Sequence, residues 1–113
     1  MMDWKDGNAG MRDKLRNLNR AKPEMSKGFG ALTKAAKAGD ALDAKTLEFV
    51  ALGIAVADRC EACIGFHIEA LIRLGASREE VSDVLAMSVQ MGGGPSLMYA
   101  AKALDCFDQL ATD

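Results

Sequence analysis

Two cysteines and the only histidine lie close together in the middle of the chain, in the pattern C-x-x-C-x-x-x-H. They are Cys60, Cys63 and His67. Residues three and four positions apart share one face of an α-helix, so a helix here would stack the three side chains along one stripe. A histidine in that place can accept the thiol proton and leave the reactive thiolate. Cys60 would also lie at the positive end of the helix dipole. The spacing therefore predicts thiol–disulfide redox chemistry.

Glu48 is the fourth candidate for this site. If the helices on either side of Arg59 pair in antiparallel fashion, Glu48 and His67 differ in depth by about one turn, at ~1.5 Å rise per residue. A lone carboxylate in so apolar a helix is costly to bury without a partner. We therefore expect Glu48 to bind His67 directly or through a water, which would align an orienting acid, a base and the Cys63 nucleophile.

Three other uses of the cysteine pair are weaker. Thiolates and imidazole also bind zinc, but a fourth ligand would be needed and Cys106 is the only spare thiol. Covalent haem attachment requires a histidine directly after the second cysteine, where this chain has Ile64. Ordinary core packing of the two cysteines and the histidine is the third alternative. We expect no metal or cofactor, and we expect Cys106 to be a core or interface residue.

The elements that must position these residues are all predicted to be helices. No segment alternates β-branched residues as a strand would. Asp43 is a plausible N-cap, Ser77 with Glu80 is typical of a capping box, and Pro95 suits the first turn of a last helix. The segment 44–58 is apolar almost all round, which indicates a central, buried helix. The predicted helices cover about residues 26–38, 44–58, 60–75, 77–91 and 95–110.

These helices predict an all-α fold, a single-domain antiparallel helical bundle. A chain of 113 residues with 50% hydrophobic and 27% charged residues has the composition of one globular domain. We divide it into a polar N-terminal lead or short helix, residues 1–25, and a helical domain, residues 26–113. The size is small enough that a partner subunit would help to bury apolar surface.

Charge and hydropathy bear on partners and location. The net charge is -2 and the basic residues are dispersed, so no nucleic-acid partner or anionic membrane surface is expected. The longest apolar stretch, residues 49–57, is far shorter than a membrane span. The first ten residues, MMDWKDGNAG, lack the apolar core of a secretory signal, so we expect a cytosolic protein.

The order Glu48, Cys60, Cys63, His67 resembles the active-site pattern of the alkylhydroperoxidase D-like branch of the carboxymuconolactone decarboxylase family. The segment MGGGPSLMYAAKAL, residues 91–104, is similar to the C-terminal part of small members of that family. Together the resemblance covers residues 31–110. It implies an all-helical subunit that assembles into homo-oligomers, trimers or hexamers, and that serves as an antioxidant peroxidase.

The resemblance also implies a role for each site residue. Cys63 would attack a hydroperoxide oxygen and become a sulfenic acid, and Cys60 would resolve it to a Cys60–Cys63 disulfide. His67 and Glu48 would form the proton relay. A dithiol or a thioredoxin-like reductant would close the cycle, in line with the rule that redox-sensitive thiols stand beside a resolving thiol.

One departure from that pattern concerns the residues between the cysteines. The peroxidases of the branch carry a further histidine there, where this chain has Glu61 and Ala62. A carboxylate in place of a donor disfavours the thiolate. Two alternative functions therefore stay open: a lactone enzyme similar to the decarboxylases of the family, which lack the cysteine pair, and a non-catalytic assembly module whose thiols sense redox state.

Overall fold

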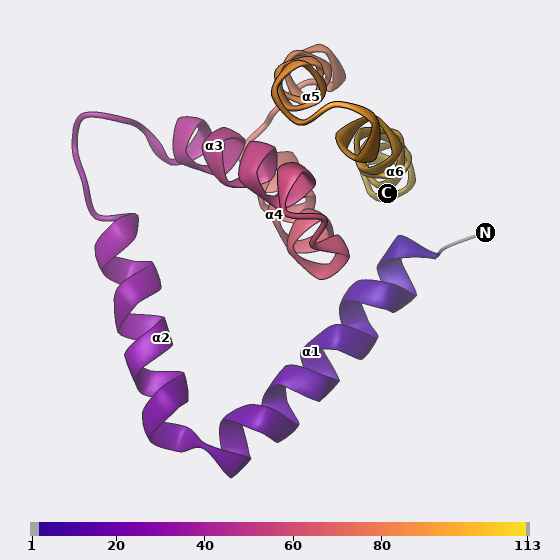
Figure 1. Cartoon of the computed structure of the whole chain (residues 1–113). Coiled ribbons are helices and arrows are strands. Elements are labelled where there is room, and N and C mark those ends of the chain that lie inside the picture. Colours follow the sequence, from indigo (N-terminus) through magenta and orange to yellow (C-terminus); the bar gives the residue numbers. More distant parts are fainter. Residues whose placement is uncertain (1–2, 113) are drawn as a thin grey trace.

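Helices make up the secondary structure of residues 3–112, the part of the chain described by the structure, a computed structural model. No strand occurs within these residues, so the all-α prediction is confirmed. In the same range, no helix combines the length and the apolar character needed to cross a membrane. The helices are α1 (Trp4–Ala21), α2 (Pro23–Ala36), α3 (Ala44–Ala57), α4 (Glu61–Arg73), α5 (Arg78–Gly92) and α6 (Gly94–Ala111) (Figure 1).

Capping residues define the starts of three helices, as the sequence predicts. The Asp43 carboxylate accepts a hydrogen bond of 2.8 Å from the Thr46 backbone N–H at the start of α3. Ser77 and Glu80 form the predicted capping box of α5. Pro95 lies in the first turn of α6. Such a cap stabilises a helix by about 1 kcal/mol, and all the predicted helices lie within one turn of their expected bounds.

Helices α3 to α6 pack around one core (Figure 1). Cys106 is fully buried in this core, as a core residue would be. Burial raises the pKa of its thiol to about 12, and the neighbouring Asp105 carboxylate adds to the rise. Helix α3 is not buried all round, because Val50 and Ile54 are 51% and 56% exposed. The largest fully buried side chains come from all four helices: Leu52, Val56, Ile64, Ile68, Leu71, Val81 and Cys106.

The N-terminal segment differs from its prediction. Where a polar lead or short helix was expected over residues 1–25, α1 is an 18-residue helix; residues 1 and 2, like residue 113, lie outside the described range. Trp4 is 3% exposed and its indole N–H donates to Asp105 over 3.3 Å. The Asn8 amide donates to the Gly65 carbonyl over 3.0 Å. Two anchors one helical turn apart attach α1 to α6 and α4, although most of its residues are polar. The domain boundary after residue 25 stays a prediction.

Helix α2 stands away from the core. Figure 1 shows α1 and α2 as the two arms of a V, with α2 leading back towards α3. No residue of α2 is buried, and among the described helices it packs only against α1. Met25, Phe29 and Leu32 repeat at helical spacing and are 47%, 67% and 63% exposed. We call these three residues the α2 stripe.

Candidate active site

The turn between α3 and α4 places Cys60 at the start of α4. Helix α3 ends in a Schellman motif, in which the Arg59 N–H donates to Val56 over 3.1 Å and the Cys60 N–H to Ala55 over 3.0 Å. Arg59 has a left-handed backbone, with φ of 57°. Cys60 is then the N-cap of α4, and its sulfur accepts a hydrogen bond of 3.2 Å from the Cys63 N–H. The Cys60 sulfur therefore lies at the positive end of α4.

Cys60 and Cys63 are joined by a disulfide. Their Cα atoms are 5.2 Å apart, and bridging requires a separation below about 7 Å. The N-cap and first turn of α4 thus satisfy the requirement without help from another element. Both residues are half-buried, and Cys63 packs against the hydrophobic core.

Glu48 and His67 face each other across α3 and α4. His67 Nδ1 and Glu48 Oε2 are 2.6 Å apart, and the Glu48 side chain is 6% exposed against 29% for His67. Burial alone would raise the pKa of Glu48, but the hydrogen bonds and charges of His67 and Lys37 outweigh it and lower that pKa. The ionised Glu48 holds the ring through Nδ1, which leaves Nε2 to exchange a proton. His67 follows Cys63 by four residues, one turn along the same face of α4.

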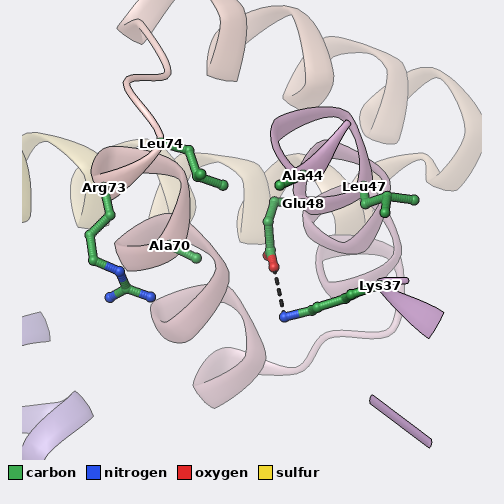
Figure 2. Close-up of a pocket in the computed structure, with 7 residues that line it drawn as sticks. All are labelled: Lys37, Ala44, Leu47, Glu48, Ala70, Arg73 and Leu74. Atoms are coloured by element: carbon green, nitrogen blue, oxygen red, sulfur yellow. Dashed lines mark ion pairs between the residues drawn. The ribbon is translucent and has the colours of Figure 1, made fainter. Parts of the chain in front are cut away.

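Lys37 is a member of this group that the sequence did not reveal. Its ammonium Nζ lies 3.0 Å from Glu48 Oε1 (Figure 2). Because His67 binds Oε2, each oxygen of the carboxylate has its own partner. Lys37 is the C-cap residue of α2. A lysine at a helix C-terminus is common because it complements the helix dipole. Only the path of residues 38–43 back to α3 brings it to Glu48, and no local pattern signals that contact.

A cavity of about 230 Å³ opens beside the Glu48 carboxylate. Its wall holds two cationic groups and one carboxylate, with apolar side chains between them. Neither Cys60 nor Cys63 lines it, so the cavity extends the site on the Glu48 side. Figure 2 shows the lining residues, which come from the end of α2, the start of α3 and the end of α4: Lys37, Ala44, Leu47, Glu48, Ala70, Arg73 and Leu74.

The carboxylate between the two cysteines is paired. Glu61 Oε2 lies 2.7 Å from the Lys102 ammonium on α6, and this contact raises the pKa of Lys102. The same ammonium is 5.0 Å from the centre of the Tyr99 ring. The penalty that Glu61 imposes on a neighbouring thiolate is therefore partly offset, although both partners are half-exposed and screened by water.

The ligand set for a metal is incomplete. Within residues 3–112, no group of three or more His, Cys, Asp or Glu side chains is arranged to hold a metal ion. The free thiol of Cys106 is buried in the core. The arrangement on α3 and α4 is instead that of a dithiol–disulfide pair next to an acid–base pair.

Comparison with known proteins gives the same fold. Residues 23–105 match the carboxymuconolactone decarboxylase family. An uncharacterized protein of Cupriavidus necator is 41% identical over 93 residues, 82% of each chain. A Legionella pneumophila protein of that family has a solved structure with TM-score 0.92, 44% identity and 96% coverage of both chains. A Thermotoga maritima member, whose description suggests a role in antioxidative response, has TM-score 0.83 and 25% identity, over 94% of this chain and 91% of its own. The chain belongs to the carboxymuconolactone decarboxylase family.

Proposed function

We propose that this protein is a thiol-dependent hydroperoxide reductase and disulfide oxidoreductase, in which Cys60 and Cys63 cycle between dithiol and disulfide. One observation carries the proposal: the disulfide lies at the start of α4, one turn before a histidine that is bound to the buried Glu48 carboxylate. A cysteine pair alone would serve disulfide exchange. The His67–Glu48 pair adds the proton transfer that cleavage of an O–O bond requires.

In the oxidative half-reaction, the Cys63 thiolate attacks the terminal oxygen of a hydroperoxide ROOH. The S–O bond forms as the O–O bond breaks, which leaves a sulfenic acid on Cys63 and an alkoxide that takes up a proton to become ROH. His67 first accepts the Cys63 thiol proton and then returns it to the alkoxide. Glu48 stabilises the imidazolium between these two transfers.

Resolution and reduction complete the cycle. The Cys60 thiolate attacks the sulfenic sulfur of Cys63, forms the disulfide and releases the oxygen as water. An external dithiol, such as that of a thioredoxin-like protein, then attacks the disulfide through a mixed-disulfide intermediate. The reductant leaves as its own disulfide, and both cysteines regain their protons. The Thermotoga maritima relative, whose description suggests involvement in antioxidative response, supports this class of reaction.

We also propose that the chain forms a homo-oligomer, a trimer or a hexamer. Two apolar surfaces are open: the α2 stripe, and a groove of about 560 Å³ between α3 and α5. Isolated exposed apolar residues are ordinary, but contiguous apolar patches mark interaction sites. A second copy of this chain offers both surfaces at once. The exposed apolar side chains of the groove are Val50, Ile54, Met87 and Met91.

Hydroperoxide turnover by the reduced protein, with several dithiol reductants, tests the proposed reaction. Cys63→Ser should abolish turnover. Cys60→Ser should perform one attack and stop, leaving a sulfenic acid that dimedone traps or a mixed disulfide with the reductant. Cys106→Ala is the matched control because it removes the buried third thiol, and it should retain turnover. Wild-type turnover by Cys63→Ser would show that the proposal is wrong.

The same samples separate the two competing functions. A lactone decarboxylase would convert a carboxylated lactone and would do so without the thiols of Cys60 and Cys63. A redox-sensing module would form the Cys60–Cys63 disulfide once with peroxide, but no dithiol would support repeated turnover.

A further inference from the structure

We propose that Lys37 is a positioning residue for His67. By neutralising part of the Glu48 charge, Lys37 limits how tightly that carboxylate retains a proton on His67, and so keeps His67 able to act as a base. The catalytic consequence rests on the proposed thiol chemistry, whereas the effect on His67 itself can be measured without any turnover.

The buried Glu48 carboxylate lies between two more exposed partners, Lys37 and His67. Glu48 is 6% exposed, His67 is 29% exposed and Lys37 is 55% exposed. Glu48 Oε2 has few water contacts and lies 2.6 Å from His67 Nδ1, so its negative charge faces the ring directly. An imidazolium locked in such an ion pair cannot accept the proton of a thiol. The Lys37 ammonium, 3.0 Å from the other oxygen of Glu48, competes for the same negative charge.

Other charged groups around the pair have partners of their own. Arg73 lines the same cavity as Lys37 (Figure 2). Its guanidinium, however, donates to Glu69 over 3.1 Å. Cys63, one turn away on α4, is in the disulfide. The paired groups on α3, α4 and the helices packed against them are Glu69 with Arg12 and Arg73, Lys45 with Glu80, Lys102 with Glu61, and Asp105 with Trp4 and Gln109. Lys37 is the cation that the structure places on Glu48.

Lys37 reaches the site from outside the four-helix core. It caps α2, which packs only against α1 among the described helices. The ion pair with Glu48 therefore ties the end of α2 to α3. The position of α2 therefore determines whether the Lys37 ammonium reaches Glu48, and through Glu48 it affects His67.

An NMR titration gives the direct test. His67 is the only histidine in the sequence, so in tag-free protein its Cε1–H signal can be followed against pH without assignment. Lys37→Met removes the charge and keeps an apolar stem. It should raise the midpoint of the His67 titration by roughly 0.5–1 pH unit, which is a three- to tenfold increase in proton affinity. The shift is no larger because the charge of a half-exposed lysine is partly screened by water. Lys37→Arg should restore the wild-type midpoint.

Lys34→Met is the matched control, because Lys34 lies in the exposed last turn of the same helix and undergoes the same change of charge. It should leave the His67 midpoint unchanged. A Lys37→Met midpoint equal to that of the wild type would overturn the inference. So would an equal shift in Lys34→Met, because the effect would then be one of net charge and not of the contact with Glu48.

The pH dependence of the thiol reaction gives the second readout. In reduced Lys37→Met, the acidic limb of the rate of hydroperoxide reduction should move to higher pH, with a three- to tenfold loss at about pH 6 and little loss on the alkaline plateau. A purely structural role of Lys37 would lower the rate equally at every pH, and that result would overturn the inference. If the wild type reduces no hydroperoxide, the proposed function fails, while the His67 titration still decides the role of Lys37.

Discussion

Glu48 holds a negative charge in a place where burial opposes it. The lowered pKa of its carboxyl shows that His67 and Lys37 more than offset the loss of hydration. A carboxyl whose pKa is lower in the folded state than its unfolded value of about 4.5 stabilises the fold above that unfolded value. The contribution disappears as the pH falls through the folded-state pKa. Glu48 therefore affects how the free energy of unfolding varies with pH, and this effect does not depend on catalysis.

We predict that Glu48→Gln reduces the acid sensitivity of the fold. The wild-type free energy of unfolding should decrease as the pH falls below the unfolded value of about 4.5, and Glu48→Gln should lose less because its side chain does not titrate. Urea unfolding at a series of pH values measures the difference. Glu24→Gln, at an exposed position in the first turn of α2, is the control. Parallel pH profiles for the wild type and Glu48→Gln would contradict the argument.

Glu61 and Lys102 should tune the reactivity of the reduced cysteines in opposite directions. Lys102→Met leaves the Glu61 carboxylate uncompensated next to Cys60, so alkylation of the reduced pair by iodoacetamide at neutral pH should slow by about two- to fivefold. Glu61→Gln removes the charge and should accelerate the alkylation by a similar factor. In the double variant the two effects should not add, because each acts through the same ion pair. Additive effects would mean that the 2.7 Å contact is not the cause.

Two helices of the core end in the same way with different residues. Arg59 follows α3 with φ of 57°, and Gly75 follows α4 with φ of 81°. In both motifs the N–H groups that follow the helix donate to carbonyl oxygens of its last turn, as the Gly75 N–H does to the Ile72 carbonyl over 3.1 Å. A side chain disfavours the left-handed region by about 1–2 kcal/mol, and glycine does not carry that cost. The turn that positions Cys60 thus contains backbone strain.

Substitution at these two positions should have opposite effects on stability. Arg59→Gly should raise the free energy of unfolding by about 0.5–1 kcal/mol, because the relief of strain exceeds the extra entropy of the unfolded glycine. Gly75→Ala should lower it by about 1 kcal/mol, and it isolates the backbone effect because an added Cβ would meet no atom within 4 Å. Chemical denaturation measures both. A destabilised Arg59→Gly would indicate that the arginine side chain has a structural role of its own.

The predictable parts of the structure are those encoded over a few residues. Helices α3 to α6 were predicted from caps and spacing. The contact between Glu48 and His67 was predicted because the two residues lie at similar distances from the short turn that joins α3 and α4. The full length of helix α1 was not predicted, because its anchors, Trp4 and Asn8, bind Asp105 and Gly65, which lie 101 and 57 residues further along the sequence. Lys37 was missed for the same reason: its contact depends on the path of a loop, which no local pattern records.

The open apolar surfaces of this protein are the feature that a single chain leaves unexplained. No side chain of the described residues, 3–112, buries the α2 stripe. The groove between α3 and α5 is lined by apolar side chains that include Phe49 and Met87. We predict that the wild type sediments as a trimer or hexamer, and that Phe29→Glu shifts it to smaller species because a charge cannot be buried in an apolar interface. Thr33→Glu, at an exposed position on α2, is the control. A monomeric wild type would contradict the assembly.

Under the proposed function, peroxide oxidises Cys60 and Cys63 together. The most direct measurement adds one equivalent of an organic hydroperoxide to the fully reduced protein and analyses it by mass spectrometry after blocking free thiols. We predict the loss of two hydrogen atoms, a Cys60–Cys63 disulfide in the digest, one equivalent of alcohol and a free Cys106. Recovery of all three cysteines as blocked thiols, with the hydroperoxide unconsumed, would contradict the account.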